Sequence, residues 1–218
     1  MRTPVLYRLL ELPLVYSVAQ KLLSPEAGVF LRRQFRGIFE PSDKRVLDIC
    51  CGPASALQLP KGIIVGVDIN PLYVRRYICG NLGDKKSSES QARFGCVCSA
   101  GSLPFKDASF DETRCIGAFH HLDKESVSSS IKEMARCTRP GGRVIVFDSV
   151  WPRVAVYRPL AWLSCRFDRG KWMLKEDELL MLANGVCPGD WQYRRFTYTF
   201  TGLEGLFLTL TKKAYKHE

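Results

Sequence analysis

The 218-residue sequence has no run of about 18 or more apolar residues, so it offers no candidate for a membrane-spanning helix. Charged residues and a proline interrupt residues 1–23, which therefore do not have the pattern of a signal peptide. We expect a cytoplasmic protein without a transmembrane segment. The sequence gives no indication of the oligomeric state.

The sequence also lacks a C-x-x-C motif, although it contains nine cysteines. They are spread along the chain, and their odd number means that they cannot all pair in disulfides. A chain of this length can build a hydrophobic core without disulfides, and cysteine is a common small residue in such cores. We therefore expect reduced cysteines in the interior and no metal site.

Acidic residues are in the minority, because 22 Asp and Glu oppose 32 Lys and Arg, which gives a formal net charge of +10. The basic residues form only short clusters, at residues 32–36, 75–76, 194–195 and 212–213. A dispersed positive charge is typical of a solvated surface, whereas a face that binds nucleic acid concentrates it. Nucleic acid is therefore the less favoured partner, and a small-molecule acceptor the more favoured one.

Strand-like and helix-like segments alternate from residue 46 onward. Short apolar runs of the kind found in buried parallel strands occupy residues 46–49, 63–67, 94–98, 112–117 and 143–147. Helical patterns occupy residues 126–136 and 176–183, and an antiparallel strand pair is expected at 194–201 and 205–212. This order predicts an α/β fold with a Rossmann-like, doubly wound sheet of seven strands, mostly parallel with one antiparallel strand near the C-terminus.

Two segments outside these strands have the composition of caps. Residues 6–23 and 28–39 have the pattern of amphipathic helices, and residues 151–175 are rich in aromatic and aliphatic side chains without a clear period. We expect an N-terminal helical cap over 1–40 and a core domain over 41–218, with 151–175 inserted as a second cap. The N-terminal side chains expected to line an acceptor site with that insertion are Leu6, Leu10, Leu14 and Tyr16.

Acidic residues lie at the ends of the first two predicted strands. Asp48 precedes the turn Cys50-Cys51-Gly52, and Asp68 follows 20 residues after it (68 − 48). This spacing is typical of proteins that bind an adenine nucleoside across neighbouring strand ends, where the second acid binds the ribose. The turn lacks the G-x-G-x-x-G pattern of dinucleotide sites, and the carboxylate of Asp48 would repel a pyrophosphate. A positively charged adenosine compound therefore fits better than NAD.

Four segments together resemble the motifs of the class I S-adenosylmethionine-dependent methyltransferases, in particular the small-molecule enzymes called type 11. VLDICCGPASA (46–56) resembles the first motif of that family, and VGVDINP (65–71) resembles the second. CSAGSLPFKDASFDETRCIGAFHHL (98–122) resembles the third and fourth, and ARCTRPGGRVIVFD (135–148) resembles the segment that leads into the fifth strand. The resemblance covers most of the chain, and it implies S-adenosyl-L-methionine as the cofactor and a direct displacement reaction.

The resemblance also implies roles for residues at four strand ends. At the second strand end, Asp68 would bind the ribose and Ile69 would pack on the adenine, with Asn70 in the same segment. The residues implied for the methionine end are Asp48, Cys50, Cys51 and Gly52 after the first strand, and Cys115, Ile116 and Gly117 after the fourth. The residues implied for the adenine edge are Ser99 and Ala100.

The sequence departs from the family pattern at three positions. Cys50 and Ala54 stand where most relatives have glycine, and Ser99 stands where most have an acid. We expect Cys50 to keep a negative φ, so that only Gly52 supplies a backbone conformation that favours glycine. The hydroxyl of Ser99 can still accept a hydrogen bond from the adenine amino group, although more weakly than a carboxylate.

Catalytic candidates follow the fourth and fifth predicted strands. Two of the three histidines, His120 and His121, lie beside the expected cofactor site, where either could take a proton from the acceptor as a general base. Asp148 is the third candidate. All three also have a structural interpretation, in which they order a loop or cap a helix, and the same holds for Asp48 and Asp68. No base is needed for an acceptor that is already nucleophilic, because the sulfonium is a strong electrophile and alignment supplies much of the acceleration.

Taken together, the motifs favour methyl transfer from S-adenosylmethionine to a small apolar, aromatic or lipid-like acceptor. One alternative is methylation of nucleic acid, RNA in particular, which the net charge would serve. The sequence lacks the Asn/Asp-Pro-Pro-Tyr/Phe motif of many such enzymes after the fourth strand. A second alternative is a protein with this fold that binds the cofactor without methylating anything.

Overall fold

The computed structural model of the protein describes residues 27–35, 43–52, 62–79, 92–154, 156, 158–168 and 170–214. The helix predicted over 6–23, with the acceptor-site residues expected in it, lies outside the described residues, and so does Ala54. Within the described part of the chain, every helix is too short or too polar to cross a membrane.

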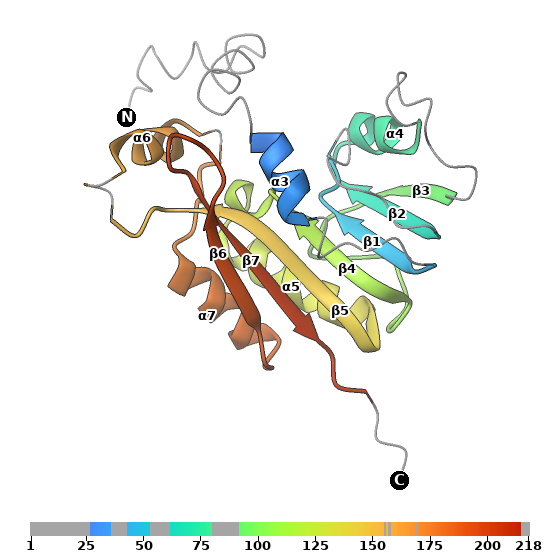
Figure 1. Cartoon of the computed structure of the whole chain (residues 1–218). Helices are drawn as coiled ribbons and strands as arrows, with labels where there is room; N and C mark the ends of the chain where they lie inside the picture. The colour runs from blue at the N-terminus through green and yellow to red at the C-terminus, as the bar shows by residue number, and fades with distance from the viewer. Residues whose placement is uncertain are drawn as a thin grey trace.

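A seven-stranded sheet forms the centre of the molecule, in the order β3-β2-β1-β4-β5-β7-β6 (Figure 1). The first five strands of the chain pair in parallel, whereas β7 lies antiparallel between β5 and β6. The predicted fold, with one antiparallel strand near the C-terminus, is therefore confirmed. The strands are β1 (Arg45–Ile49), β2 (Ile63–Asp68), β3 (Ala92–Val97), β4 (Phe110–Ile116), β5 (Thr138–Val150), β6 (Gln192–Thr197) and β7 (Glu204–Thr211).

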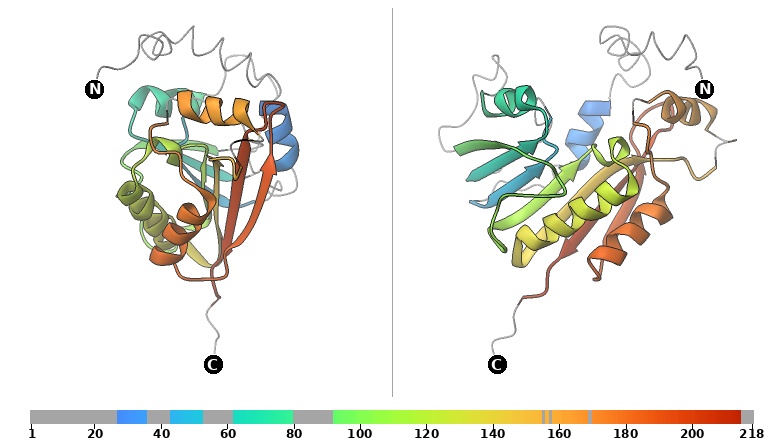
Figure 2. Two further views of the ribbon diagram at one scale, coloured as in Figure 1. Left: turned by 90° about the vertical axis from the view of Figure 1, so that its left-hand side faces the viewer. Right: turned by 180° about the vertical axis from the view of Figure 1, so that it is seen from behind.

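Both faces of the sheet are covered, which explains the continuous apolar runs in the sequence. Neighbouring residues of a strand point to opposite faces, and all four residues of the stretch 144–147 in β5 are buried. Phe147 packs edge-on against Phe35 on one face, with 5.1 Å between ring centroids, whereas Val146 packs with Met134 on the other. The helices are α3 (Ala27–Phe35) and α4 (Pro71–Cys79) on the first face, and α5 (Lys124–Cys137) and α7 (Glu176–Val186) on the second (Figure 2).

The cap predicted over 151–175 contains a helix that the sequence did not predict, α6 (Pro159–Phe167). Ala161 and Cys165 face the protein, whereas Leu160 and Leu163 face outward. Because both sides of this helix are apolar, it has no clear amphipathic period. α6 lies at the end of the sheet at which β5 and β6 finish (Figure 1). The division of the chain into an N-terminal cap, a core domain and an inserted cap remains a prediction.

Candidate active site

The carboxyl ends of the first five strands meet at one edge of the sheet. Ile49 is paired with Val67 on one side and with Cys115 on the other, and Ile116 is paired with Phe147. The predicted cofactor residues follow these positions. The registers thus bring four short segments together at one edge: 48–52, 68–70, 99–100 and 115–117.

The turn after β1 has two residues in the left-handed region. Gly52 has a φ of +61°, as expected, but Cys50 has a φ of +53°, so the prediction of a negative φ for Cys50 is wrong. A side chain in this region costs roughly 1–2 kcal/mol, which explains why glycine is the usual residue there. The turn brings the Cys51 amide within 3.0 Å of the Val67 carbonyl and the Gly52 amide within 3.1 Å of Asp68 Oδ2. The end of β2 therefore holds the turn that follows β1.

Asp48 is buried and its carboxylate belongs to an ion pair inside the protein. Asp48 Oδ2 accepts hydrogen bonds from Arg114 Nη2 at 3.2 Å and from Tyr77 Oη at 2.8 Å, and Arg114 is completely buried in β4. Burial alone would lower the pKa of Arg114, but the carboxylate of Asp48 raises it above its ordinary value. The negative charge that the sequence places at the turn entrance is therefore balanced by a guanidinium.

Gly66 of β2 allows Tyr77 to reach Asp48. A Cβ atom on Gly66 would lie 2.5 Å from Cδ1 and Cε1 of Tyr77, so only glycine lets this ring approach the strand so closely. Burial and the neighbouring carboxylate of Asp48 both raise the pKa of Tyr77 well above its ordinary value. The phenol therefore stays protonated and acts as a hydrogen-bond donor.

Asp68 connects the turn after β1 to the start of α4. Besides accepting from the Gly52 amide, its carboxylate accepts from the Asn70 amide at 2.9 Å through Oδ1. Asn70 in turn caps α4, because its Oδ1 accepts from the Leu72 amide at 2.9 Å. Between these two residues, Ile69 is 77% exposed. Asp68 and Ile69 thus remain at the surface of the strand edge, as expected of residues that meet a ligand.

The other predicted cofactor residues lie after β3 and β4. Ser99 is exposed, and its hydroxyl accepts from the Gly101 amide at 3.3 Å, whereas Ala100 packs partly against the core. Ile116 is half-buried, and Gly117 is exposed with a φ of +68°. The Gly117 amide donates to the Phe147 carbonyl at 2.7 Å, which fixes the end of β4 against β5.

The thiols around the turn are held in the protonated form. A hydrogen bond with Cys50, together with burial, raises the pKa of Cys115 well above its ordinary value. Burial is also the main cause of the raised pKa of Cys51. It is likewise the main cause that raises the pKa of Cys98 to about 12. Because the thiolate is the nucleophile, these three thiols are poor candidates for covalent catalysis.

The structure brings two of the three predicted catalytic residues into contact. His120 Nδ1 lies 2.6 Å from Asp148 Oδ1, and the His120 amide donates to Asp148 Oδ2 at 2.8 Å. His120 belongs to the short helix η1 (Phe119–His121) after β4, and Asp148 lies near the end of β5. The third candidate, His121, is exposed, and its ring centroid is 4.0 Å from that of His120.

The cap covers His120 from the other side. His120 Nε2 lies 3.7 Å from Asp168 Oδ1, and the Trp172 amide donates to the His120 carbonyl at 3.0 Å. A Cβ atom on Gly170 would lie 2.3 Å from His120 Cδ2, so glycine is required where the chain passes the ring. His120 is therefore fixed between β5 and the segment that follows α6.

This environment keeps His120 positively charged at neutral pH. Burial alone would lower its pKa, but the carboxylates of Asp148 and Asp168 raise it to about 9. An imidazolium donates protons and cannot accept one, so His120 can act as a general base only after it has lost its proton. At neutral pH the geometry suits a hydrogen-bond donor.

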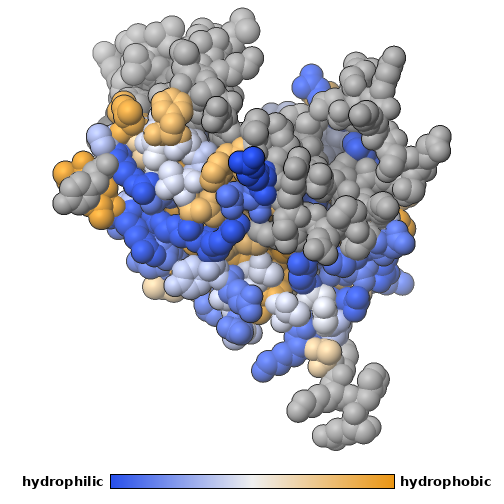
Figure 3. Space-filling view, in the orientation of Figure 1, coloured by the Kyte–Doolittle hydropathy of each residue, from blue (hydrophilic) through white to orange (hydrophobic). Residues whose placement is uncertain are grey.

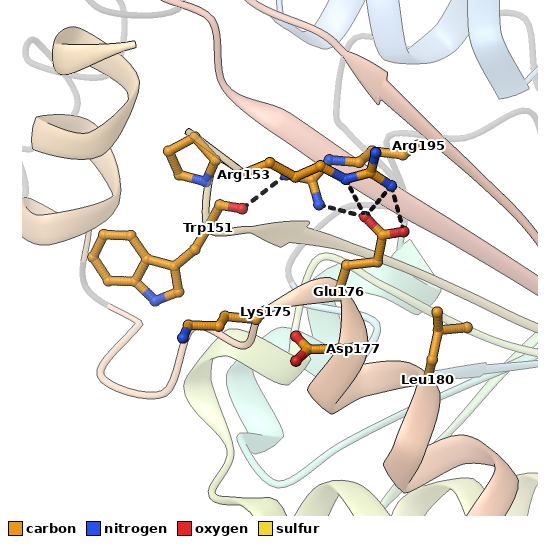
Figure 4. Close-up of a pocket in the computed structure, with 8 residues that line it drawn as sticks. Trp151, Arg153, Lys175, Glu176, Asp177, Leu180 and Arg195 are labelled. Carbon is orange, nitrogen blue, oxygen red and sulfur yellow. Dashed lines mark hydrogen bonds and ion pairs between the residues drawn. The ribbon is translucent and has the colours of Figure 1, made fainter. Parts of the chain in front are cut away.

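A pocket of about 430 Å³ opens at the end of β5, next to the start of α7 (Figure 4). Trp151 and Leu180 supply apolar walls, and two arginines approach Glu176, which accepts from Arg153 Nη2 at 2.7 Å and from Arg195 Nη1 at 2.6 Å. Hydrogen bonds from Arg153 and Arg195 lower the pKa of Glu176 despite its burial. The remaining lining residues are Pro152, Lys175 and Asp177.

Four residues that shape this region were not predicted as site residues from the sequence: Tyr77, Arg114, Asp168 and Gly170. A signal existed for Arg114, because a charged residue within a buried strand needs a counter-charge in the interior. Local pattern gives no comparable signal for the other three, whose partners are far along the chain.

Comparisons with known proteins agree with this geometry. The family described as "Methyltransferase domain" matches residues 47–146. The chain is 32% identical over 141 residues to human "Probable tRNA methyltransferase 9B". The aligned part is 62% of this chain and 26% of that protein. It is 33% identical over 134 residues to demethylmenaquinone methyltransferase of Geobacillus kaustophilus, and the aligned part is 57% of this chain and 53% of that protein.

The chain thus spans about a quarter and about half of the lengths of these two curated relatives. Among solved structures, an S-adenosylmethionine-dependent methyltransferase of Methanosarcina mazei superposes with a TM-score of 0.63 at 20% identity. The superposition covers 82% of this chain and 97% of that one, and it shows that the two share a fold. Residues 47–146 thus match a methyltransferase domain, and the whole described chain shares the strand order and fold of an S-adenosylmethionine-dependent methyltransferase.

Proposed function

We propose that the protein transfers the methyl group of S-adenosylmethionine to a small apolar, aromatic or lipid-like acceptor by direct displacement. The observation that supports this most strongly is the match of residues 47–146 to the methyltransferase domain. That range holds most of β1, all of β2 to β4 and the first part of β5, and the carboxyl ends of β1 to β4 carry the predicted cofactor residues at one edge.

The residues at this edge fit an adenosine compound without phosphates. A Cβ built on Gly52 or Gly117 would meet no described atom within 4 Å, so both turns leave open backbone beside the strand ends. Asp68 supplies a carboxylate for the ribose hydroxyls, and the exposed side chain of Ile69 supplies an apolar surface for the adenine. Cys50, Cys51, Ser99, Ala100, Cys115 and Ile116 are the other residues proposed to line the cofactor.

Aromatic side chains of the cap support an apolar or aromatic acceptor. The rings of Trp151 and Trp162 lie 6.3 Å apart, and Trp172 is joined to His120 through the backbone. Trp151 is linked to the same segment, because its amide donates to the Leu174 carbonyl at 3.1 Å. Tryptophan rings offer flat apolar surfaces to a ligand, and the ring of Trp151 does so in a pocket whose other walls include Arg153 and Glu176.

S-adenosylmethionine, when bound, would supply an electrophilic methyl group, whose bond to sulfur breaks as a lone pair of the acceptor attacks. The contribution of the protein is to align the acceptor and to exclude water. At neutral pH, His120 would donate a hydrogen bond to the acceptor, and Asp148 would hold the ring of His120 in place. Above its pKa, His120 would accept the acceptor proton.

Methylation of RNA is the second candidate, which the net charge of +10 and the similarity to a protein named as a tRNA methyltransferase favour. Many arginines of the described chain are already paired with acids, however. The pairs include Arg136 with Glu133 and Asp107, Arg143 with Glu112, Arg153 with Glu176, and Arg158 with Glu204. Paired arginines are less available to phosphates, so this candidate ranks second.

Calorimetry with S-adenosylmethionine tests the cofactor, with Asp68→Asn as the variant and Asp190→Asn as the matched control. Asp190 is an exposed surface acid with no role in the proposed site. We expect Asp68→Asn to weaken binding by roughly tenfold or more, because hydrogen bonds to a charged group are replaced by neutral ones. Equal affinity of both variants and the parent would contradict the assignment of the ribose site.

Formation of S-adenosylhomocysteine with different acceptors tests the reaction. One set of assays contains hydroxylated aromatic compounds, including reduced demethylmenaquinone, and the other contains unmodified tRNA. We expect turnover only with the first set. Turnover with tRNA alone would establish the second candidate, and binding of the cofactor without turnover on any acceptor would indicate a protein that does not methylate.

A further inference from the structure

Several large apolar side chains of the cap are exposed at the end of the sheet where β5 and β6 finish. The most exposed members are Val156 at 84% and Phe200 at 70%. Figure 3 shows apolar residues gathered at this end of the molecule. The residues that form this apolar face are Val154, Val156, Leu160, Trp162, Leu163 and Phe200.

The residues of this apolar face come from two parts of the chain that hydrogen bonds join. Arg158, which precedes α6, donates through Nη1 to the Gly202 carbonyl at 2.9 Å and to Thr197 Oγ1 at 2.7 Å. These contacts fasten the start of α6 to the hairpin between β6 and β7, which carries Phe200. Arg158 therefore links both parts of the chain that contribute to the face.

The orientation of α6 is the reverse of what a water-facing helix shows. Its small residues Ala161 and Cys165 are turned inward, whereas Leu160, Trp162 and Leu163 are turned outward. A surface helix normally places its large apolar residues toward the core and its polar residues toward water. A cluster of this kind on a protein surface marks a place where another apolar surface binds.

Exposed basic residues accompany this face. Arg166 lies on α6 itself, and Lys171 and Lys175 follow in the segment after the helix. Large aliphatic side chains with an aromatic ring and nearby lysine or arginine are typical of protein surfaces that enter the headgroup region of a bilayer. RNA offers phosphates and polar base edges, which would leave the leucines and valines without partners.

We propose that this apolar face docks on the surface of a membrane that contains anionic lipids. Val154, Leu160, Leu163 and Phe200 would enter the boundary between headgroups and acyl chains, while the basic residues meet the lipid phosphates. The face lies on the same cap that covers His120, because Trp162 contacts Trp151 and the Trp172 amide binds the His120 carbonyl. Docking would bring the site close to apolar compounds of the bilayer, a consequence that rests on the proposed function.

Co-sedimentation of the full chain with lipid vesicles tests the proposal. One vesicle preparation contains phosphatidylcholine alone, and the other contains phosphatidylcholine mixed with phosphatidylglycerol. The triple variant Leu160→Ser, Leu163→Ser, Phe200→Ser removes three apolar anchors, and Met181→Ser on α7 is the matched control because Met181 is 71% exposed but lies elsewhere. Thermal unfolding of each variant establishes that it is folded.

We expect binding to the mixed vesicles that exceeds binding to phosphatidylcholine alone and that added salt weakens. The triple variant should bind at least about tenfold more weakly, because several buried CH₂ equivalents are lost, whereas Met181→Ser should bind like the parent. Methyl transfer to an acceptor dispersed in detergent should be the same in all three proteins. This readout separates a failure of the docking proposal from a failure of the proposed function.

Three results would overturn the proposal. The first is no sedimentation with either kind of vesicle, and the second is equal sedimentation of the parent and the triple variant. The third is a dimer of the parent, measured by light scattering, that the triple variant loses while vesicle binding stays absent. That outcome would assign the face to a second copy of the chain.

Discussion

Replacing Asp48 by asparagine would leave the guanidinium of Arg114 in the core without its nearest counter-charge. The side chains of Arg114 and Asp48 are only 1% and 6% exposed, and their closest atoms are 3.2 Å apart. Water therefore screens both charges only weakly. Asp48→Asn and Arg114→Met, alone and together, test how this pair contributes to folding.

The expected magnitudes follow from the burial of the pair. Breaking a buried ion pair on one side costs about 3–5 kcal/mol, because the remaining charge or polar group stays desolvated. This is a large part of the roughly 5–15 kcal/mol that stabilises a typical domain. The double variant removes both charges, so we expect it to lose clearly less than the sum of the two single variants, by about 1–3 kcal/mol.

Urea unfolding followed by far-ultraviolet circular dichroism measures these free energies of unfolding at neutral pH. Tyr77→Phe is a useful control because it removes only one hydrogen bond to Asp48, which should cost about 1–2 kcal/mol. The reasoning would be refuted if each single variant lost less than about 1 kcal/mol and the losses were additive. If Asp48→Asn is destabilised as expected, a loss of cofactor binding in this variant would not by itself show that Asp48 contacts the cofactor.

Three further predictions concern the turn and the cap. Cys50→Gly should leave the free energy of unfolding unchanged or raise it by up to about 1–2 kcal/mol, because glycine adopts a positive φ without strain. Gly52→Ala should lower it by about 1 kcal/mol, although no described atom crowds the new methyl group. Urea unfolding measures both values. Folding raises the pKa of His120 from 6.5 to about 9, so protonation of His120 stabilises the folded state by about 3 kcal/mol at most. This stabilisation is complete below pH 6.5 and is lost as the pH rises through about 9. His120→Gln should flatten that part of the stability profile, and an unchanged profile would contradict the assignment. Gly170→Ala should weaken activity and lower the midpoint of thermal unfolding, because its Cβ would collide with His120; wild-type behaviour would show that the cap yields easily.

The sheet could be predicted from the sequence because its strands are buried on both faces. Residues 46–49, 63–67 and 143–147 are continuous apolar runs, and they lie within β1, β2 and β5. β5 nevertheless begins at Thr138, before the turn signal of Pro140-Gly141-Gly142. Pairing of the Gly141 amide with the Lys212 carbonyl at 2.9 Å extends the strand through a segment whose composition predicts a turn.

α6 and the backbone of Cys50 could not be predicted, for different physical reasons. α6 is apolar on both sides, so its period is hidden by the outward-facing leucines that the structure places in the apolar face. At Cys50, the rule that only glycine adopts a positive φ failed, because interactions of the turn with the end of β2 outweigh a penalty of roughly 1–2 kcal/mol. Sequence rules of this kind give the ordinary preference of a residue, and they do not include contacts made 16 residues away.

The two acids at the strand ends have separate roles, which changes the electrostatic argument for the cofactor. From sequence alone, Asp48 and Asp68 together make the turn negative and thereby favour a cationic ligand. In the structure, Arg114 balances Asp48 in the interior, so Asp48 adds little field at the surface of the turn. Among the described residues, the carboxylate of Asp68 accepts from two backbone amides, and no described cation forms a salt bridge with it. The proposal for a sulfonium compound therefore depends on Asp68, and calorimetry with Asp68→Asn tests it more directly than any substitution of Asp48.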